Sequence, residues 1–266
     1  MSADELERAA RARFRLLPDI QSLMADFARS IADEIEAGAT RLILPVGPVA
    51  QYPLLVDICR REAISWRNVH VFLMDEFLDW QGRPIGAGHP LSFEGYFRRN
   101  VLPHVDLPES QFTVPHPFRI EEASERIAAA GGIDVCYGGI GYHGHVAFNE
   151  PPLSRWRTVS VAELRESRTR VLTLGDDSIV VQSIHSAGGN CEAIPPMAVT
   201  LGMKDILASR KIRLYCAAGP RHQAVFRRTV AGEVTVAYPA TLVQGHPDAE
   251  ICTDIATAEP IAVGLR

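Results

Sequence analysis

The stretch GGIGYHGHVAFNEPP, residues 138–152, combines histidines, glycines and a carboxylate at close spacing. His143 and His145 are separated by one residue, so on an extended backbone both imidazoles face the same side. Glu150 follows in the same stretch, and a carboxylate that orients a histidine is a recurring acid–base unit. The residue types therefore predict proton transfer at this place in the chain.

Two other interpretations of the histidines remain open. Together with Glu150 and Asp75, they could supply nitrogen and oxygen ligands to a metal ion. The spacing matches no familiar ligand pattern such as HExxH, so the metal site is the less favoured interpretation. A purely structural role is the second alternative, although glycine-rich strand ends seldom need imidazoles for packing.

Glycines follow two of the predicted strands and would let the backbone approach a ligand closely. At the end of the strand predicted over 133–140, these are Gly138, Gly139 and Gly141. Gly47 follows a strand predicted over 41–45 and leads into a helix. Such a turn either holds an anion at the helix N-terminus or only connects the two elements, and both alternatives stay open.

Two adjacent carboxylates, Asp75 and Glu76, follow the strand predicted over 69–74. Neighbouring side chains on an extended backbone face opposite ways, so we expect one to face the site and the other to be structural. An acidic surface pair is the alternative, but the end of a buried strand favours a functional role. We include Asp75 as a catalytic candidate and Glu76 as a substrate-binding candidate.

Apolar periodicity predicts strands and helices in alternation. The predicted strands cover residues 41–45, 69–74, 133–140, 168–174, 197–202, 211–219 and 249–254. The predicted helices cover 20–35, 51–63, 91–102, 120–132, 177–187, 203–209, 221–231 and 239–245. This order predicts an α/β fold with a doubly wound, mostly parallel sheet and helices on both faces, as one domain over residues 1–266. Ligands of such sheets bind beyond the carboxyl ends of the strands.

Composition excludes several classes of protein. The 266 residues carry a net charge of −5, which gives no general attraction to nucleic acid. No apolar run approaches the ~20 residues needed to cross a bilayer, and the charged N-terminus is not a signal peptide. The 5 cysteines form no CxxC pair, which favours reduced core thiols and a cytoplasmic location.

The motifs MDEF, HPLSFEGYF, GGIGYHGHVAFNEP, SRTR and AVTLGMKDIL occur in this order along the chain. With them, roughly residues 10–255 resemble the glucosamine-6-phosphate deaminase/isomerase family, which is related to the 6-phosphogluconolactonases. The resemblance implies a modified Rossmann-like fold without redox cofactor or catalytic metal. It also implies a reaction that opens an amino-sugar phosphate ring, moves a proton between C2 and C1, and releases ammonia to leave a ketose phosphate.

The resemblance also implies roles for individual residues. Asp75 matches the carboxylate that carries the proton between the carbons, and His145 matches the ring-opening histidine. Glu150 matches the carboxylate that orients this histidine, and the glycines would bring backbone N–H groups near the sugar hydroxyls. His143 departs from the family, which has an acidic residue there, so we treat it as a substrate-adapted catalytic candidate.

The phosphate site implied by the resemblance is altered in this sequence. The family loop after the first strand, T-G-[GS]-T-P, is replaced by Val46–Ala50, where the hydroxyls are lost and Pro48 removes a backbone donor. A family arginine aligns near His185, and a family lysine aligns near His222 with Arg221 beside it. Two explanations stay open: Arg221, His222 and His185 form an anion site, or the substrate is not a 6-phosphate. Arg170 remains in place to hold substrate oxygens.

The leading hypothesis is a sugar isomerase or deaminase that acts on a phosphorylated or free amino sugar or a related sugar. A lactonase, which would hydrolyse an ester without a C–H base, is the nearest alternative. A sugar-sensing or otherwise non-catalytic homologue is the second, although the ~40 residues before the first predicted strand leave little room for a DNA-binding domain. We expect a small sugar or sugar phosphate as the partner, neither nucleic acid nor membrane, and leave a homo-oligomer open.

Overall fold

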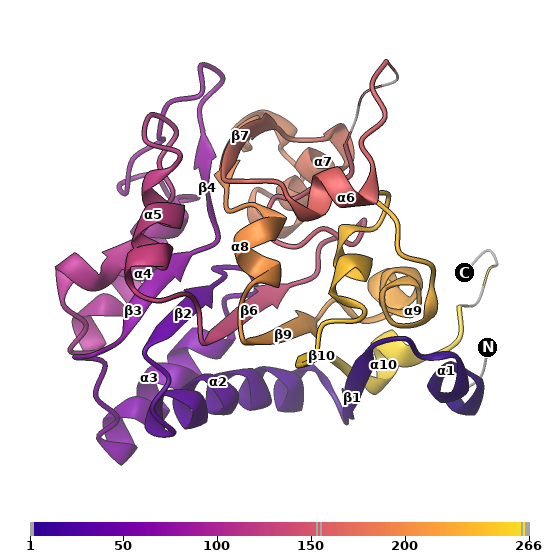
Figure 1. Cartoon of the computed structure of the whole chain (residues 1–266), viewed down its shortest axis with the longest axis horizontal. Coiled ribbons are helices and arrows are strands. Elements are labelled where there is room, and N and C mark those ends of the chain that lie inside the picture. Colours follow the sequence, from indigo (N-terminus) through magenta and orange to yellow (C-terminus); the bar gives the residue numbers. More distant parts are fainter. Residues whose placement is uncertain (1–2, 153, 155, 262, 264–266) are drawn as a thin grey trace.

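The computed structural model describes residues 3–152, 154, 156–261 and 263. Its main sheet has seven strands in the order β1-β10-β9-β6-β2-β3-β5, and every neighbouring pair is parallel (Figure 1). The strands are β1 (Arg13–Leu17), β2 (Arg41–Leu44), β3 (His70–Leu73), β5 (Phe112–Thr113), β6 (Val135–Gly139), β9 (Lys211–Cys216) and β10 (Ala249–Asp254). The predicted doubly wound, mostly parallel α/β architecture is confirmed.

The main sheet is buried on both faces because its side chains alternate between two hydrophobic cores. In β2, Leu42 and Leu44 pack into the core that also receives α2 (Ile20–Glu36) and α3 (Gln51–Glu62). Ile43, between them, faces the other core. This second core is covered by α1, α5, α6, α8, α9 and α10 (Ala3–Ala9, Glu122–Ala129, Val161–Arg165, Met203–Leu207, Gln223–Ala231 and Ile255–Ala258). Continuous apolar strands thus follow from burial on two faces.

A second sheet has three antiparallel strands, β4 (Asp75–Leu78), β8 (Met197–Thr200) and β7 (Arg170–Thr173), in the order β4-β8-β7. It stands at the upper side of the molecule in Figure 1, above the main sheet. The sequence predicts strands 168–174 and 197–202 but not this separate sheet. Two further helices, α4 (Phe93–Asn100) and α7 (Asp176–Ser186), complete this side.

Several element predictions need correction. Strands β1, β4 and β5 were not predicted, because β1 and β5 lie at the edges of the main sheet and β4 continues the apolar run of β3 without a turn signal. The helix predicted over 239–245 is a 3₁₀-helix, Pro239–Val243. We continue to predict one domain over residues 1–266.

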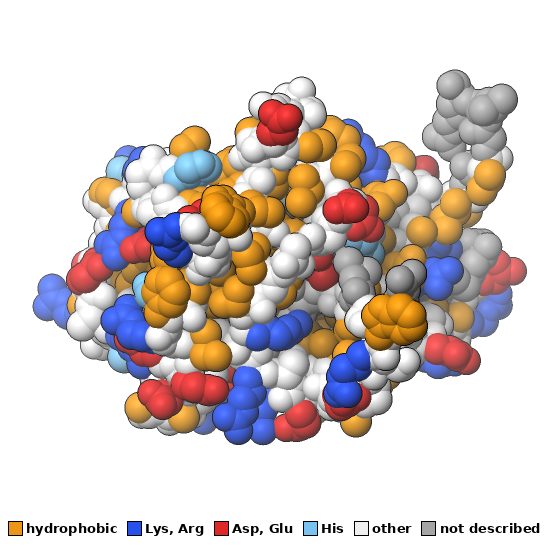
Figure 2. All heavy atoms as spheres, turned by 90° about the horizontal axis from the view of Figure 1, so that it is seen from above, with side chains coloured by type: hydrophobic (Ala, Val, Ile, Leu, Met, Phe, Trp, Pro, Cys, Tyr) orange, Lys and Arg blue, Asp and Glu red, His pale blue; other side chains and the backbone are white. Residues whose placement is uncertain are grey.

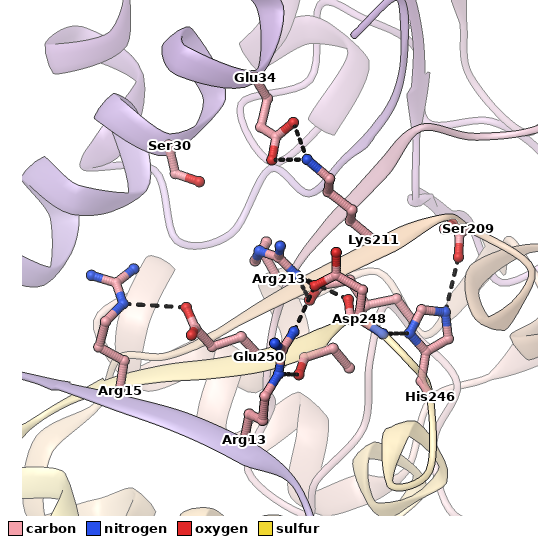
Figure 3. Close-up of polar contacts among 12 residues, drawn as sticks. Arg13, Arg15, Ser30, Glu34, Ser209, Lys211, Arg213, His246, Asp248 and Glu250 are labelled. Carbon is pink, nitrogen blue, oxygen red and sulfur yellow. Dashed lines mark hydrogen bonds and ion pairs between the residues drawn. The ribbon is translucent and has the colours of Figure 1, made fainter. Parts of the chain in front are cut away.

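The amino ends of β1, β9 and β10 are tied together by ion pairs (Figure 3). Asp248 accepts from Arg13 at 2.6 Å and from Arg213 at 2.9 Å, and Lys211 contacts Glu34 of α2 at 2.8 Å. These charged side chains lie at the amino ends of the strands, away from the carboxyl ends. Because they pair with one another, we assign them a role in stabilising the sheet.

Helix α2 is fixed to the sheet by aromatic stacking. The ring of Phe27, fully buried, stacks on Tyr215 of β9 at a centroid distance of 3.8 Å and on Tyr137 of β6 at 5.7 Å. The hydroxyl of Tyr215 donates to Asp26 at 3.0 Å, so the same tyrosine also forms a polar contact with the helix. Stacked aromatic pairs contribute beyond the area they bury.

We expect Phe27→Ala to lower the free energy of unfolding by about 3–5 kcal/mol, because it leaves a cavity between two tyrosines. Ile20→Ala on the same helix is the control: Ile20 is 43% exposed, and its truncation should change stability by about 0.5 kcal/mol or less. Chemical denaturation of the three proteins measures the difference. Equal midpoints for the two variants would contradict this account of α2.

Candidate active site

A cavity of about 460 Å³ lies at the carboxyl ends of β2 and β6. The two strands are neighbours at the centre of the sheet, and the chain runs outward from them in opposite directions, through β3 on one side and β9 on the other. Such a reversal is the topological switch point where α/β sheets bind ligands. Residues 45–50, after β2, and residues 139–142, from the end of β6, line the cavity together with α7. Figure 2 looks down on this upper end of the molecule, where hydrophobic side chains gather over the middle of the face.

Asp75 lines this cavity from the first position of β4. It is only 7% exposed, and its strand partner is Thr200 of β8. Burial, followed by the neighbouring Glu76, raises the pKa of the Asp75 carboxyl well above its ordinary value, against a backbone hydrogen bond from Phe148 that lowers it. A carboxylate with a raised pKa is a stronger base once it is ionised.

Glu76 has a different environment from its neighbour. Its carboxylate accepts hydrogen bonds from the hydroxyl of Ser92 at 2.8 Å and from the backbone N–H groups of Phe93, at 3.0 Å, and Glu94, at 2.8 Å. These donors form the N-terminus of α4, where a carboxylate is favourable. The structure therefore gives Glu76 a structural contact in place of the predicted substrate contact, and it does not line the cavity.

The two histidines contact each other. His143 Nδ1 and His145 Nδ1 are 3.2 Å apart, and the second ring nitrogen of His143, Nε2, lies 2.8 Å from Oδ2 of Asp177. His145 lines the cavity, as Asp75 does. Burial, then His143 and His222, lowers the pKa of His145 to about 3, so its imidazole is neutral at physiological pH. A neutral imidazole can accept a proton from one atom and return it to another.

The carboxylate that contacts the histidine pair in the structure is not Glu150. Within the described part of the chain, no hydrogen bond joins Glu150 to either histidine, and the carboxylate at the histidine pair is Asp177. Glu150 accepts instead from the backbone N–H of Gly175, at 2.7 Å, directly before α7. The predicted role is therefore not supported by the position of Glu150, and motif spacing alone could not reveal a contact with the start of a later helix.

A second cavity, of about 230 Å³, takes in two of the predicted site residues, Glu150 and Arg170. The Arg170 guanidinium donates to the side chain of Asn149 at 2.8 Å and does not line the larger cavity. Its predicted contact with substrate oxygens in the same site as Asp75 is therefore not supported by its position.

The predicted glycines fall into two groups. Gly47, Gly139 and Gly141 line the larger cavity, whereas Gly138 does not. A Cβ atom on Gly141 would lie 1.9 Å from His145 Nε2, so only glycine leaves room for the imidazole ring there. A Cβ atom on Gly138 would meet Leu214 of β9 at 2.9 Å. Gly138 is therefore required for core packing rather than for contact with a ligand.

The end of the cavity near α7 contains imidazoles but no fixed cation. His185 and His222 line it, and Arg221 Nη1 lies 3.3 Å from His185 Nε2 while the arginine itself is exposed. Among the described residues that line this cavity, none is lysine or arginine. Burial, then His185 and Arg221, lowers the pKa of His222 to about 4, so this imidazole is also neutral at physiological pH.

Sequence reasoning missed several residues at the site. From α7, the cavity is lined by His185, already a candidate for an anion site, and by four residues for which no role was predicted, Ser178, Val181, Gln182 and Ser186. Their spacing of three and four places them on one helical face, so a polar stripe at this period in the predicted helix 177–187 was the available signal. Asp177, which precedes this stripe, carried no such signal because its partner is 34 residues earlier in the chain.

Over the described ranges 3–152, 154, 156–261 and 263, no group of three or more His, Cys, Asp or Glu side chains could hold a metal ion. The set considered from the sequence, with both histidines, Glu150 and Asp75, is thus not brought together.

Of the helices described, none is both long and apolar enough to span a membrane.

The chain is similar to known proteins in its sequence. The family model described as glucosamine-6-phosphate isomerases/6-phosphogluconolactonase matches residues 19–252. A glucosamine-6-phosphate deaminase of Porphyromonas gingivalis is 31% identical over 95% of both chains. One of Thermoanaerobacter pseudethanolicus is 30% identical over 78% of this chain and 77% of its own.

Two solved structures share the fold. A monomeric glucosamine-6-phosphate deaminase superposes with a TM-score of 0.79 at 24% identity, covering 92% of this chain and 98% of that one. The 6-phosphogluconolactonase of Trypanosoma brucei has a TM-score of 0.69 at 17% identity, covering 95% of this chain and 100% of its own. With the family model and the sequence relatives above, the chain belongs to the family of glucosamine-6-phosphate isomerases and 6-phosphogluconolactonases.

Proposed function

We propose that this protein is a sugar isomerase/deaminase that opens the ring of an amino sugar or amino-sugar phosphate and moves a proton between C2 and C1. The observation that carries the proposal is that a buried carboxyl, Asp75, and a neutral imidazole, His145, line one cavity. At about 460 Å³, the cavity is of a size that holds a single sugar. The relatives' names support the same reaction class.

In the proposed reaction, His145 takes the proton of the anomeric hydroxyl and returns it to the ring oxygen as the C1–O5 bond breaks and a C1 carbonyl forms. Asp75 then removes the proton from C2, and the electron pair of this C–H bond forms a C1–C2 double bond while water gives a proton to the carbonyl oxygen. Return of the proton from Asp75 to C1 leaves an iminium at C2 when the substrate carries an amine. Water hydrolyses this iminium to a ketone and ammonia.

The raised pKa of Asp75 sets the direction of the pH dependence. Proton abstraction needs the ionised carboxylate, and burial delays ionisation to a higher pH than for an exposed aspartate. Turnover should therefore fall as the pH drops through this raised pKa, well before an ordinary carboxyl would be protonated. The same raised pKa makes the ionised carboxylate of Asp75 a stronger base.

The contacts at the α7 end of the cavity support a weak preference for phosphorylated sugars. No cation lines this end among the described residues, His222 is neutral, and Pro48 takes away a backbone donor beside the start of α3. The remaining charge is the exposed Arg221 next to His185. An exposed charge contributes about 0–1 kcal/mol, which corresponds to less than about tenfold in affinity.

We expect Asp75→Asn to abolish release of ammonia and formation of ketose, with a loss of at least about a thousandfold, while substrate binding is retained. The amide keeps the shape of the side chain but cannot take a proton. Glucosamine-6-phosphate, glucosamine and plain aldoses are the substrates, with ammonia and ketose assays as the readout and calorimetry for binding. Asp57→Asn, a substitution on the exposed side of α3, is the control.

Three outcomes would count against the proposal. Full turnover by the Asp75→Asn variant would remove Asp75 from the mechanism. Failure of the unmodified protein with every sugar would reject the isomerase/deaminase function. Hydrolysis of a 6-phosphogluconolactone by both proteins would identify the lactonase alternative, since an ester needs no C–H base.

The anion-binding strength of the α7 end should depend on pH in a defined direction. Sulfate stays a dianion between pH 7.5 and 5, so changes in its affinity report on the protein. The folded-state pKa of His222 is lowered to about 4, and its proton is therefore gained only as the pH falls toward this value. We expect the dissociation constant of sulfate, measured by calorimetry, to decrease as the pH falls, mostly at the acidic end of this range, because a bound dianion favours the imidazolium.

His222→Gln should remove most of this pH dependence, whereas His104→Gln, at an exposed histidine outside the cavity, should leave it unchanged. At pH 7.5 we also expect kcat/KM for glucosamine-6-phosphate and glucosamine to differ by less than about tenfold. A pH-independent, tight sulfate affinity, together with a preference of a thousandfold for the phosphorylated sugar, would overturn this view of the α7 end.

A further inference from the structure

A continuous chain of polar contacts runs from the helix α7 to the cavity. Asp177, in the first turn of α7, contacts His143 Nε2 at 2.8 Å. His143 Nδ1 contacts His145 Nδ1 at 3.2 Å, and His145 lines the cavity. His143 is mostly buried, with 16% of its side chain exposed, whereas 55% of the Asp177 side chain is exposed.

When both imidazoles are neutral, the chemistry of these contacts determines where the protons are. An ionised carboxylate only accepts hydrogen bonds, so His143 must carry a proton on Nε2 to contact Asp177. Although burial acts to raise the pKa of Asp177, the hydrogen bond from His143 lowers it, which keeps the carboxylate ionised. A neutral His143 protonated on Nε2 has an unprotonated Nδ1, which accepts. The contact between the two Nδ1 atoms then requires a proton on His145 Nδ1.

His145 Nε2 is consequently left without a proton. This nitrogen approaches Gly141, whose missing side chain makes room for it, and both residues line the cavity. An unprotonated Nε2 is the form that can take the proton of a sugar hydroxyl. The opposite tautomer, with a proton on Nε2, could only donate at that atom.

We propose that Asp177 is a positioning residue that fixes the tautomer of the catalytic imidazole through His143, and so supplies at one remove the negative charge that a carboxylate at position 143 would supply directly. The inference rests on the proposed ring-opening function of His145. It goes beyond that function because Asp177 contacts neither the cavity nor His145.

Glu150 also has a place in this arrangement. Its carboxylate accepts from the N–H of Gly175 at 2.7 Å, and Gly175 is the residue directly before α7. Glu150 is buried, and only one residue, Asp176, separates Gly175 from Asp177 at the start of the helix. Glu150 thereby fixes the position of the turn that presents Asp177 to His143, without contacting either histidine itself.

The test compares Asp177→Asn with Asp176→Asn. Both substitutions remove one negative charge from the first turn of α7, so they change the helix to the same extent. Only Asp177 contacts His143, and an asparagine there can rotate to accept from or donate to Nε2, which removes the preference for one tautomer. We expect kcat of Asp177→Asn to fall about tenfold or more with KM unchanged, and Asp176→Asn to match the unmodified protein.

A spectroscopic readout separates this inference from the proposed function. In protein labelled with ¹⁵N at the histidine rings, nuclear magnetic resonance distinguishes protonated from unprotonated ring nitrogens. We expect His145 to be protonated on Nδ1 and unprotonated on Nε2, and Asp177→Asn to shift it toward the other tautomer, with His145→Gln identifying the signals. This readout needs no turnover, so an inactive protein would reject the function while the tautomer still tests the inference.

A second background sharpens the result. In a His143→Asp variant a carboxylate contacts His145 directly, so adding Asp177→Asn should have no further effect on kcat. The inference is overturned if Asp177→Asn and Asp176→Asn behave alike in kcat and in the imidazole signals. It is also overturned if His145 is protonated on Nε2 in the unmodified protein, or if Asp177→Asn is equally damaging in the His143→Asp background.

Discussion

The division of one extended segment between two sheets is the constraint on which the rest of the site depends. Strand β3 ends at Leu73, β4 begins at Asp75, and Met74 joins them. The N–H of Met74 donates to Leu44 of the main sheet at 3.2 Å, and its carbonyl accepts from Leu201, next to β8, at 2.8 Å. Because the segment leaves one ladder for the other at this residue, the next carboxylate lies at the junction of the two sheets, buried and facing the cavity. The raised pKa of Asp75 follows from this burial.

The second constraint is the placement of α7. This helix contributes a polar face to the cavity and, from its first turn, the carboxylate that contacts His143. Its start is held by Glu150, which comes from the same short segment as the histidines. The segment 138–152 therefore positions its own partner: one residue of it anchors the helix, and another receives the contact from that helix. Glu150, His143 and Asp177 thus form one unit, with two members from residues 138–152 and one from the start of α7.

Charge is distributed unequally over the molecule. At the amino ends of the strands, arginines and lysines pair closely with carboxylates, as Arg213 does with Asp248 at 2.9 Å. The cavity at the opposite ends is lined instead by apolar residues, the polar face of α7, the buried carboxyl of Asp75, and imidazoles, of which His145 and His222 have lowered pKa values. A cavity of this kind disfavours the retention of a strongly charged ligand.

The sequence allowed much of the fold and part of the site to be predicted, for physical reasons that differ between residues. Apolar alternation revealed most of the main sheet, and strand ends revealed Asp75 and His145 as neighbours of one cavity. The separate sheet was not foreseen, since the strand pairing of Arg170–Thr173 depends on β8 and β4 rather than on its own residues. Asp177 and the anchoring role of Glu150 were missed because both arise from contacts between segments far apart in the sequence.

The central claim, that one carboxylate carries a proton between C2 and C1, is tested most directly by running the reaction with unlabelled glucosamine-6-phosphate in heavy water. If Asp75 acts from one side of the sugar, ketose product carries deuterium at one of the two positions on C1, in proportion to exchange between the carboxyl group and the solvent. Deuterium distributed equally over both C1 positions would contradict the account, whereas its absence from C1 would show that the C2 proton is transferred without exchange.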